Sequence, residues 1–165
     1  MLTTLQLLLF LFFIFGTNTS CVSVGIETPD VNKAENISFQ EPVGFSSFEQ
    51  EPLDKAWRNL KNGNTISFLT ECKSSTDPSH KTIRDGIISG ISEASIISQK
   101  MIQFNNRPTL DSIIKGAVDG IPTKMRILIL KKDECIYTIT YVGLDNYYDD
   151  DAPSFNKFIE EFKAK

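Results

Sequence analysis

The stretch MRILIL, residues 125–130, decides the fold that this sequence predicts. Its methionine and two isoleucines fall on one face of an extended strand, and its two leucines fall on the other. A strand that is apolar on both faces needs cover on both sides, which helices above and below a sheet provide. The stretch therefore predicts a central strand in a sheet that lies between two helical layers.

Further strands are predicted on both sides of this stretch. Turn residues about every ten positions divide the chain into four extended runs: 97–104, 110–118, 124–131 and 135–142. Two shorter runs precede them around Asn62-Gly63, a dipeptide typical of tight hairpin turns. The pattern predicts an antiparallel sheet made of a hairpin and a four-strand meander, with Trp57 of the first strand in the core.

The segment between the hairpin and the meander has helical period. Asp77 suits an N-cap and Pro78 suits the first helical position. An apolar stripe follows at helical spacing: Ile83, Ile87, Ile88, Ile91 and Ala94. Gly86 and Gly90 interrupt this helix four residues apart, which predicts a close approach to another backbone.

A second helix is predicted at the end of the chain. Its apolar stripe has i, i+3, i+4, i+7 spacing: Phe155, Phe158, Ile159 and Phe162. Asp151 or Ser154 is the expected N-cap, with Pro153 in the first turn. The predicted order is therefore β-β-α-β-β-β-β-α, an α+β fold.

This order resembles the PsbP-like α/β/α sandwich family. The resemblance covers residues 56–162 and rests on the element order together with YTITYVG and FNKFIEEFK, between residues 137 and 163. It implies an antiparallel sheet flanked by helices on both faces. The family includes many bacterial envelope lipoproteins, so the resemblance implies an envelope location. It implies no functional residue, because the fold hosts unrelated roles.

The chain begins with a leader for export. Residues 5–15, LQLLLFLFFIF, are too short to span a hydrocarbon core of about 30 Å but match the core of a signal peptide. Small residues then precede Cys21, which resembles a bacterial lipoprotein signal. The resemblance implies that residues 1–20 are removed and that Cys21 carries the lipid, palmitate included. A plain secretory signal and a retained membrane anchor are the alternatives.

The exported part divides into a tether and one domain. Residues 21–52 contain three prolines and little hydrophobic periodicity, so we expect a lipid-attached flexible tether. The alternative is that Val43, Phe45 and Phe48 pack onto the domain as a first strand. Residues 53–165 hold all the periodic segments, so we expect one sandwich domain there. With Cys21 lipidated, Cys72 and Cys135 remain, and an even pair in an oxidising compartment favours a disulfide. Two buried thiols that never meet are the alternative.

The strongest polar cluster is DNYYDDD, residues 145–151. An EF-hand pattern is not met, so we expect a solvated acidic loop and no metal site. Tyr147, Tyr148, Asp149 and Asp150 are the candidate interaction surface, since exposed tyrosines are common in interfaces. His80 is a possible base, but no nucleophile has an evident orienting partner, and we expect an ordinary exposed histidine.

These features favour a non-catalytic binding or accessory module of an envelope protein complex. It would be held by the lipid on Cys21 at the periplasmic side of a bacterial membrane. A net charge of −4 disfavours a nucleic-acid partner, and no cofactor is indicated. The alternative is a small periplasmic hydrolase, using His80 or the aspartates, or a ligand-binding protein. An accessory subunit of a membrane complex is a third possibility, by analogy with the family alone.

Overall fold

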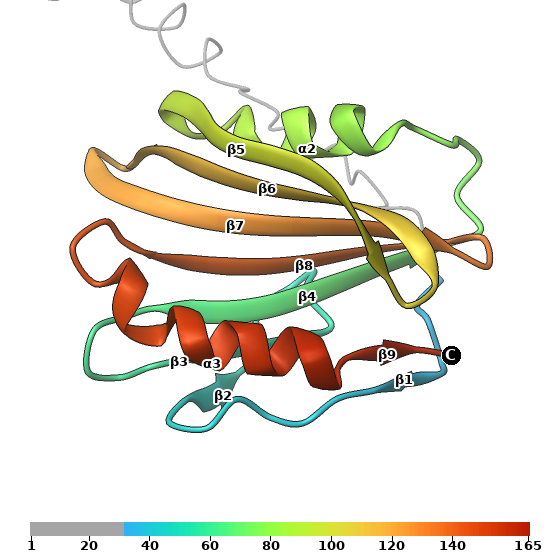
Figure 1. The fold of residues 1–165 in the computed structure, drawn as a ribbon, viewed down its shortest axis with the longest axis horizontal. Helices are drawn as coiled ribbons and strands as arrows, with labels where there is room; N and C mark the ends of the chain where they lie inside the picture. The colour runs from blue at the N-terminus through green and yellow to red at the C-terminus, as the bar shows by residue number, and fades with distance from the viewer. Residues whose placement is uncertain (1–31) are drawn as a thin grey trace, which may run out of the picture.

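A seven-stranded antiparallel sheet forms the middle layer in the computed structural model, which describes residues 32–165 (Figure 1). Its strands lie in the order β2-β3-β4-β8-β7-β6-β5. In chain order they are β2 (Ser46–Phe48), β3 (Lys55–Arg58), β4 (Thr65–Cys72), β5 (Ser92–Phe104), β6 (Arg107–Val118), β7 (Ile121–Lys132) and β8 (Cys135–Leu144). A separate pair, β1 (Ile37–Ser38) and β9 (Lys163–Ala164), joins the two ends of the described chain.

The two helices cover opposite faces of this sheet, as the alternation in β7 predicts. Leu128 and Leu130 are fully buried on the face where α3 (Tyr148–Glu161) packs, among the aromatic residues of that helix. Ile127 and Ile129 are fully buried on the other face, below the isoleucines of α2 (His80–Ile88). The predicted α+β sandwich and its element order are therefore confirmed, with additional short strands at each end.

The core on the α3 side is mainly aromatic. The Trp57 ring is buried and lies 5.5 Å from the ring of Phe158 on α3, so the predicted core position of this tryptophan is confirmed. Phe39 packs edge-on against Trp57 at 5.4 Å and against Phe68 at 5.3 Å. Edge-to-face aromatic pairs at this spacing add to the stabilisation from buried area.

Phe39 also changes the domain boundary that the sequence predicts. It belongs to the segment expected to be part of a flexible tether, yet the described part of that segment, residues 32–52, contains β1 and β2 and packs on the sheet. A flexible tether is therefore wrong for residues 32–52, because single aromatic residues at irregular spacing anchor the segment, and such spacing carries no periodic signal. The alternative of a first strand is confirmed for Phe45 and Phe48, which pack in and beside β2, whereas Val43 is exposed. The predicted signal peptide, Cys21 and the rest of the tether lie outside the described residues.

The predicted disulfide between Cys72 and Cys135 is present. The two cysteines are directly opposite each other in the antiparallel pairing of β4 with β8. Asn32 forms an isolated bridge to Cys72, so the described chain enters the fold beside the disulfide. The bond thus joins the start of β8 to the end of β4, and the backbone of Asn32 pairs beside it.

The region around α2 differs in detail from the prediction. The N-cap is Ser79, whose side chain accepts from the Thr82 amide at 3.1 Å, rather than Asp77. The helix ends at Ile88, and β5 begins at Ser92, so the last two residues of the predicted stripe lie outside the helix. No described atom lies within 4 Å of a side chain built on either glycine of this segment. The expected close approach of another backbone is therefore wrong.

The last helix begins earlier than its sequence predicts. Tyr147 is the N-cap residue and makes no side-chain capping bond. Three aspartates lie in the first turn, where their negative charges stabilise the helix by interacting with the positive end of its dipole. Pro153 consequently lies inside the helix rather than in its first turn.

None of the helices in the described part of the chain is long and apolar enough to cross a membrane.

Candidate interaction surface

The candidate surface lies on the turn between β8 and α3, where the structure separates the two tyrosines. Tyr147 is 48% exposed, whereas Tyr148 is only 4% exposed. The prediction that both belong to a surface is therefore wrong for Tyr148. Because α3 begins at this residue, its ring turns inward and packs 4.7 Å from the ring of Tyr141.

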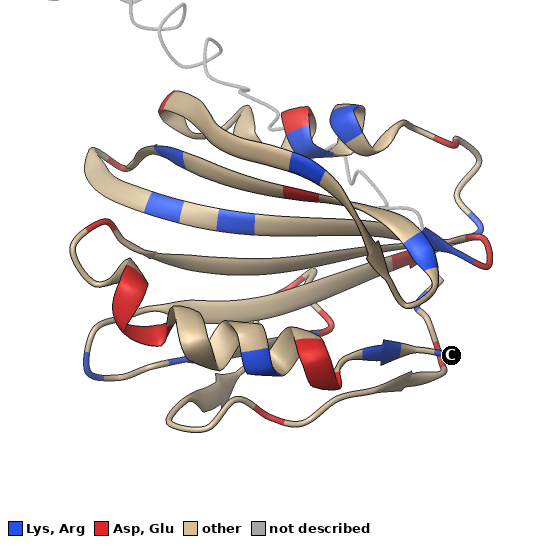
Figure 2. Cartoon of the chain, in the orientation of Figure 1, with Lys and Arg blue, Asp and Glu red and all other residues tan. Residues whose placement is uncertain are grey.

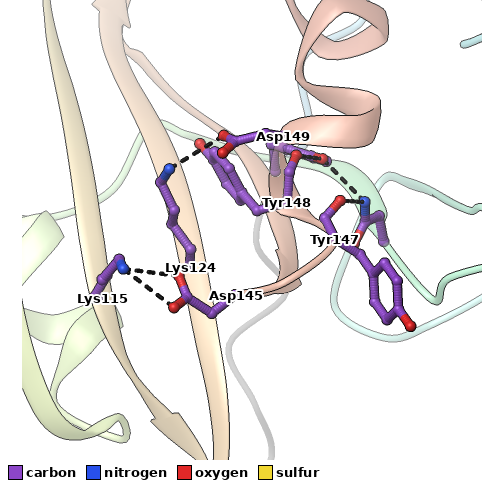
Figure 3. Close-up of polar contacts among 8 residues, drawn as sticks. Lys115, Lys124, Asp145, Tyr147, Tyr148 and Asp149 are labelled. Carbon is purple, nitrogen blue, oxygen red and sulfur yellow. Dashed lines mark hydrogen bonds and ion pairs between the residues drawn. The ribbon is translucent and has the colours of Figure 1, made fainter.

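Two lysines of the sheet hold the acidic residues around this turn (Figure 3). Lys124 on β7 lies 3.3 Å from Asp149, and its ammonium group lies 4.3 Å from the centre of the Tyr148 ring. Lys115 on β6 lies 3.0 Å from Asp145. Figure 2 shows the acidic start of α3 on one side of β8 and the basic positions of β7 on the other. Asp149 and Asp150 are exposed, so the surface consists of one tyrosine with an acidic rim.

A polar network fixes the base of the turn to the β3–β4 hairpin. The Asp151 carboxylate accepts from Asn59 Nδ2 at 3.0 Å, from Asn62 Nδ2 at 2.7 Å and from Asn64 Nδ2 at 2.9 Å. Asn59 and Asn64 are buried. The sequence analysis did not find this network, although the NLKNGN spacing of the three asparagines at one turn was a visible signal.

Asn64 links the network directly to Tyr147. Its Nδ2 also lies 2.7 Å from the Tyr147 carbonyl oxygen and 3.1 Å from the Tyr141 hydroxyl, so it shares its hydrogens among three acceptors. The Tyr141 hydroxyl in turn donates to the Tyr148 carbonyl oxygen. Gly143 lets the amide approach, because a Cβ there would lie 2.4 Å from Asn64 Oδ1. The backbone carrying the exposed tyrosine is therefore held from several directions.

Burial also sets the protonation of the inner tyrosines. Burial raises the pKa of Tyr148 to about 12, with Asp149 acting in the same direction and Arg126 against it. Burial raises the pKa of Tyr141 as well, helped by the charge of Asp151. Both hydroxyls stay neutral at physiological pH, and the neutral Tyr141 hydroxyl donates to the Tyr148 carbonyl oxygen.

An ion pair beside α3 was also missed by the sequence analysis. Arg126 on β7 donates from Nε and Nη2 to the two carboxylate oxygens of Asp111 on β6, both at 2.9 Å. Arg126 Nη1 donates to Asn156 Oδ1 on α3 at 2.7 Å. Because Asp111 is buried, this bidentate pair satisfies a charge that would otherwise be costly inside the fold.

His80 does not form a catalytic arrangement with the described residues. It is half-buried rather than exposed as predicted, and its buried Nε2 makes no hydrogen bond to any described residue. Burial and the nearby charge of Lys131 lower the pKa of His80, while Asp77 acts in the opposite direction. The hydrolase alternative therefore gains no support from this side chain.

A charged groove lies at the other end of β8, beside the disulfide. It has a volume of about 560 Å³ and is lined by acidic and basic side chains, including Glu71, Lys73 and Arg107. Two ion pairs join side chains that line this groove: Lys131 with Asp77, and Arg107 with Asp133. Within residues 32–165 no three His, Cys, Asp or Glu side chains are grouped to hold a metal ion.

This architecture is a PsbP-like fold. A cyanobacterial PsbP, CyanoP from Synechocystis sp. PCC 6803, matches with a TM-score of 0.61 and 12% identity, covering 88% of this chain and 98% of that one. LpqN of Mycobacterium tuberculosis matches with a TM-score of 0.59 and 8% identity, covering 83% and 86%. LpqN is described as involved in cell envelope biogenesis.

The Ran-binding protein Mog1p of Saccharomyces cerevisiae is also similar. It matches with a TM-score of 0.56 and 8% identity, covering 81% of this chain and 96% of that one. At these identities the similarities establish the fold and no residue roles. No protein-family model and no curated protein matches the sequence.

Proposed function

We propose that this protein is a lipoprotein on the periplasmic side of a bacterial membrane, where it acts as a non-catalytic binding or accessory module of an envelope protein complex. The lipid would be on Cys21, after removal of residues 1–20. The export leader supports this location, and an envelope role described for LpqN gives a precedent on the same fold. The binding role described for Mog1p gives a precedent for recognition by this fold.

The observation that carries the proposal is the rigid presentation of Tyr147. Its side chain is half-exposed, while Asn64 and the Asp151 network hold its backbone. A backbone segment that is already held loses little conformational freedom on binding, and tyrosine is enriched among the residues that dominate binding energy. The acidic rim of Asp149 and Asp150 fits a partner with basic side chains around an apolar pocket.

The position of this surface suits attachment through the N-terminus. The described chain enters beside Cys72, which lies opposite Cys135 at the start of β8. Tyr147 lies just beyond the other end of β8, which is ten residues long. At about 3.3 Å per residue the two points are roughly 30 Å apart. Residues 22–31 reach at most about 35 Å when fully extended. The proposed anchor thus keeps the domain close to the membrane and leaves Tyr147 at the end of the sheet opposite the chain entry.

Co-purification from detergent-solubilised membranes tests the binding role. The full chain should recover one stable partner, and Tyr147→Ala should reduce that recovery at least about tenfold, as expected for loss of a central aromatic contact. Val43→Ala is the matched control, because Val43 is a large exposed apolar residue on the loop between β1 and β2. Equal recovery by both variants, or recovery of the protein alone, would contradict the proposal.

Fractionation tests the anchor separately. Cys21→Ala should move the full chain from the membrane fraction to the soluble periplasmic fraction, because the lipid would be lost. If the variant stays in the membrane fraction as completely as the wild type, the anchor is not at Cys21.

A further inference from the structure

The β3–β4 turn contains a dipeptide that is chemically labile in water. Asn62-Gly63 is the single Asn-Gly pair of the chain. Gly63 is exposed, and no described atom lies within 4 Å of a Cβ built on it. Because glycine has no side chain in the way, its backbone nitrogen can reach the side-chain carbonyl carbon of the asparagine before it. An Asn-Gly pair in an exposed turn is therefore prone to spontaneous deamidation.

The reaction needs only water as a co-reactant. The Gly63 nitrogen loses its proton to solvent and forms a bond to Cγ of Asn62, while Nδ2 takes up a proton and leaves as ammonia. The product is a cyclic succinimide, which water opens at one of its two carbonyl carbons. Opening at Cγ gives aspartate, and opening at the backbone carbonyl carbon gives isoaspartate. One water is consumed and one ammonia is released, so a neutral amide becomes a carboxylate.

In the folded chain both reacting groups are held in hydrogen bonds. The Gly63 amide donates to the Asn59 carbonyl oxygen at 2.8 Å, so this hydrogen must leave that bond before the nitrogen can attack. Asn62 Nδ2 donates to Asp151 Oδ2 at 2.7 Å, and Asn62 Oδ1 accepts from the Asn64 amide at 3.0 Å. The side-chain amide is thus fixed at both ends, and its Cγ cannot turn toward the Gly63 nitrogen until these bonds break.

We propose that Asn62-Gly63 is a deamidation site that the Asp151 carboxylate keeps closed, and that the reaction irreversibly breaks the polar network once it occurs. The product carries a second carboxylate where Asn62 Nδ2 now donates to Asp151, so a hydrogen bond is replaced by repulsion between like charges. Asn64 Nδ2 shares Asp151 Oδ2 and also holds the Tyr147 carbonyl oxygen, so the backbone of the exposed tyrosine is loosened. A loss of partner binding through Tyr147 rests on the proposed function, whereas the reaction itself does not.

Peptide mass spectrometry of the folded full chain, incubated at mildly alkaline pH, measures the rate of deamidation at Asn62. Asp151→Ala should raise this rate about ten- to a hundredfold, as expected for loss of one hydrogen bond to a charged acceptor. Asp150→Ala changes an exposed aspartate of the same turn and should leave the rate unchanged. Ile129→Ala lowers the stability of the whole fold from the other face of the sheet, away from the network, and should leave the rate near that of the wild type.

Two results would overturn the closed site. Equal rates in the wild type and Asp151→Ala would mean that the carboxylate does not protect the dipeptide. An equal rise in Ile129→Ala and Asp151→Ala would mean that unfolding of the whole domain, rather than loss of this carboxylate, exposes it.

Asn62→Asp reproduces the product and tests its effect on the network. The Tm of this variant should fall further below that of the wild type as pH rises from about 4 to about 7, because the introduced carboxyl group becomes charged beside Asp151. Asn62→Ala removes the same donor without adding a charge, so its difference from the wild type should depend much less on pH. Equal Tm differences for the two variants at every pH would refute the repulsion. Neither measurement uses a binding partner, so their failure is distinguishable from failure of the partner-recovery test.

Discussion

Replacing Asp151 by alanine should destabilise the fold because this carboxylate joins α3 to the β3–β4 hairpin. The change removes the acceptor of Asn59 Nδ2 and Asn62 Nδ2, while Asn64 Nδ2 keeps the Tyr147 carbonyl and the Tyr141 hydroxyl. Each lost hydrogen bond to this charged carboxylate costs about 1.5–3 kcal/mol. The free energy of unfolding should therefore fall by about 3–6 kcal/mol, with a decrease of roughly 10–20 °C in Tm.

Urea unfolding followed by tryptophan fluorescence measures this loss, because Trp57 is the single tryptophan and is buried in the core that α3 covers. Asp150→Ala is the control, since it removes an exposed aspartate from the same helical turn and the same dipole interaction. Its effect should stay within about 0.5 kcal/mol. If Asp151→Ala costs no more than Asp150→Ala, the network does not hold the helix to the hairpin.

Three further predictions concern the packing, the disulfide and the pH dependence. Gly143→Ala should lower the free energy of unfolding by about 1–3 kcal/mol, because its Cβ would lie 2.4 Å from Asn64 Oδ1; an unchanged urea midpoint would contradict this close contact. Loss of the Cys72–Cys135 bond in a double serine variant should cost about 4 kcal/mol for a loop of this length, and thiol labelling of the unfolded, unreduced wild type should find neither cysteine. Since burial favours neutral Tyr148, the free energy of unfolding should decline as pH rises from about 10, the unfolded value, through the folded pKa of about 12. Tyr148→Phe should make this decline shallower, and equal slopes in a urea series would refute the assignment.

Local periodicity was enough to predict most of the fold. The alternation in MRILIL correctly indicated a strand covered on both faces, and the phenylalanine stripe correctly indicated the closing helix. Boundaries were less predictable. The stripe that seemed to continue α2 to Ala94 ends at Ile88, because β5 begins at Ser92 and pairs with β6. A pairing partner some 20 residues away overrides helical spacing there.

The candidate surface was predictable only in part. The acidic loop and the exposure of Tyr147 follow from composition, since charged and polar runs prefer solvent. The burial of Tyr148 does not follow, because it depends on the exact residue at which α3 starts and on Tyr141 and Lys124 from two strands. Phe39 was missed for a related reason, since its partners Trp57 and Phe68 belong to other strands.

The sequence by itself determined the order of the elements and the faces of the central strand, because each of these depends on residues a few positions apart. Only the tertiary structure decided which polar groups meet. The asparagines of the β3–β4 turn and Asp151 are separated by 87 to 92 positions, and the strand order brings them within 3.0 Å. The physical reason is that a sheet makes neighbours of distant segments, and only the complete fold fixes which side chains become buried together.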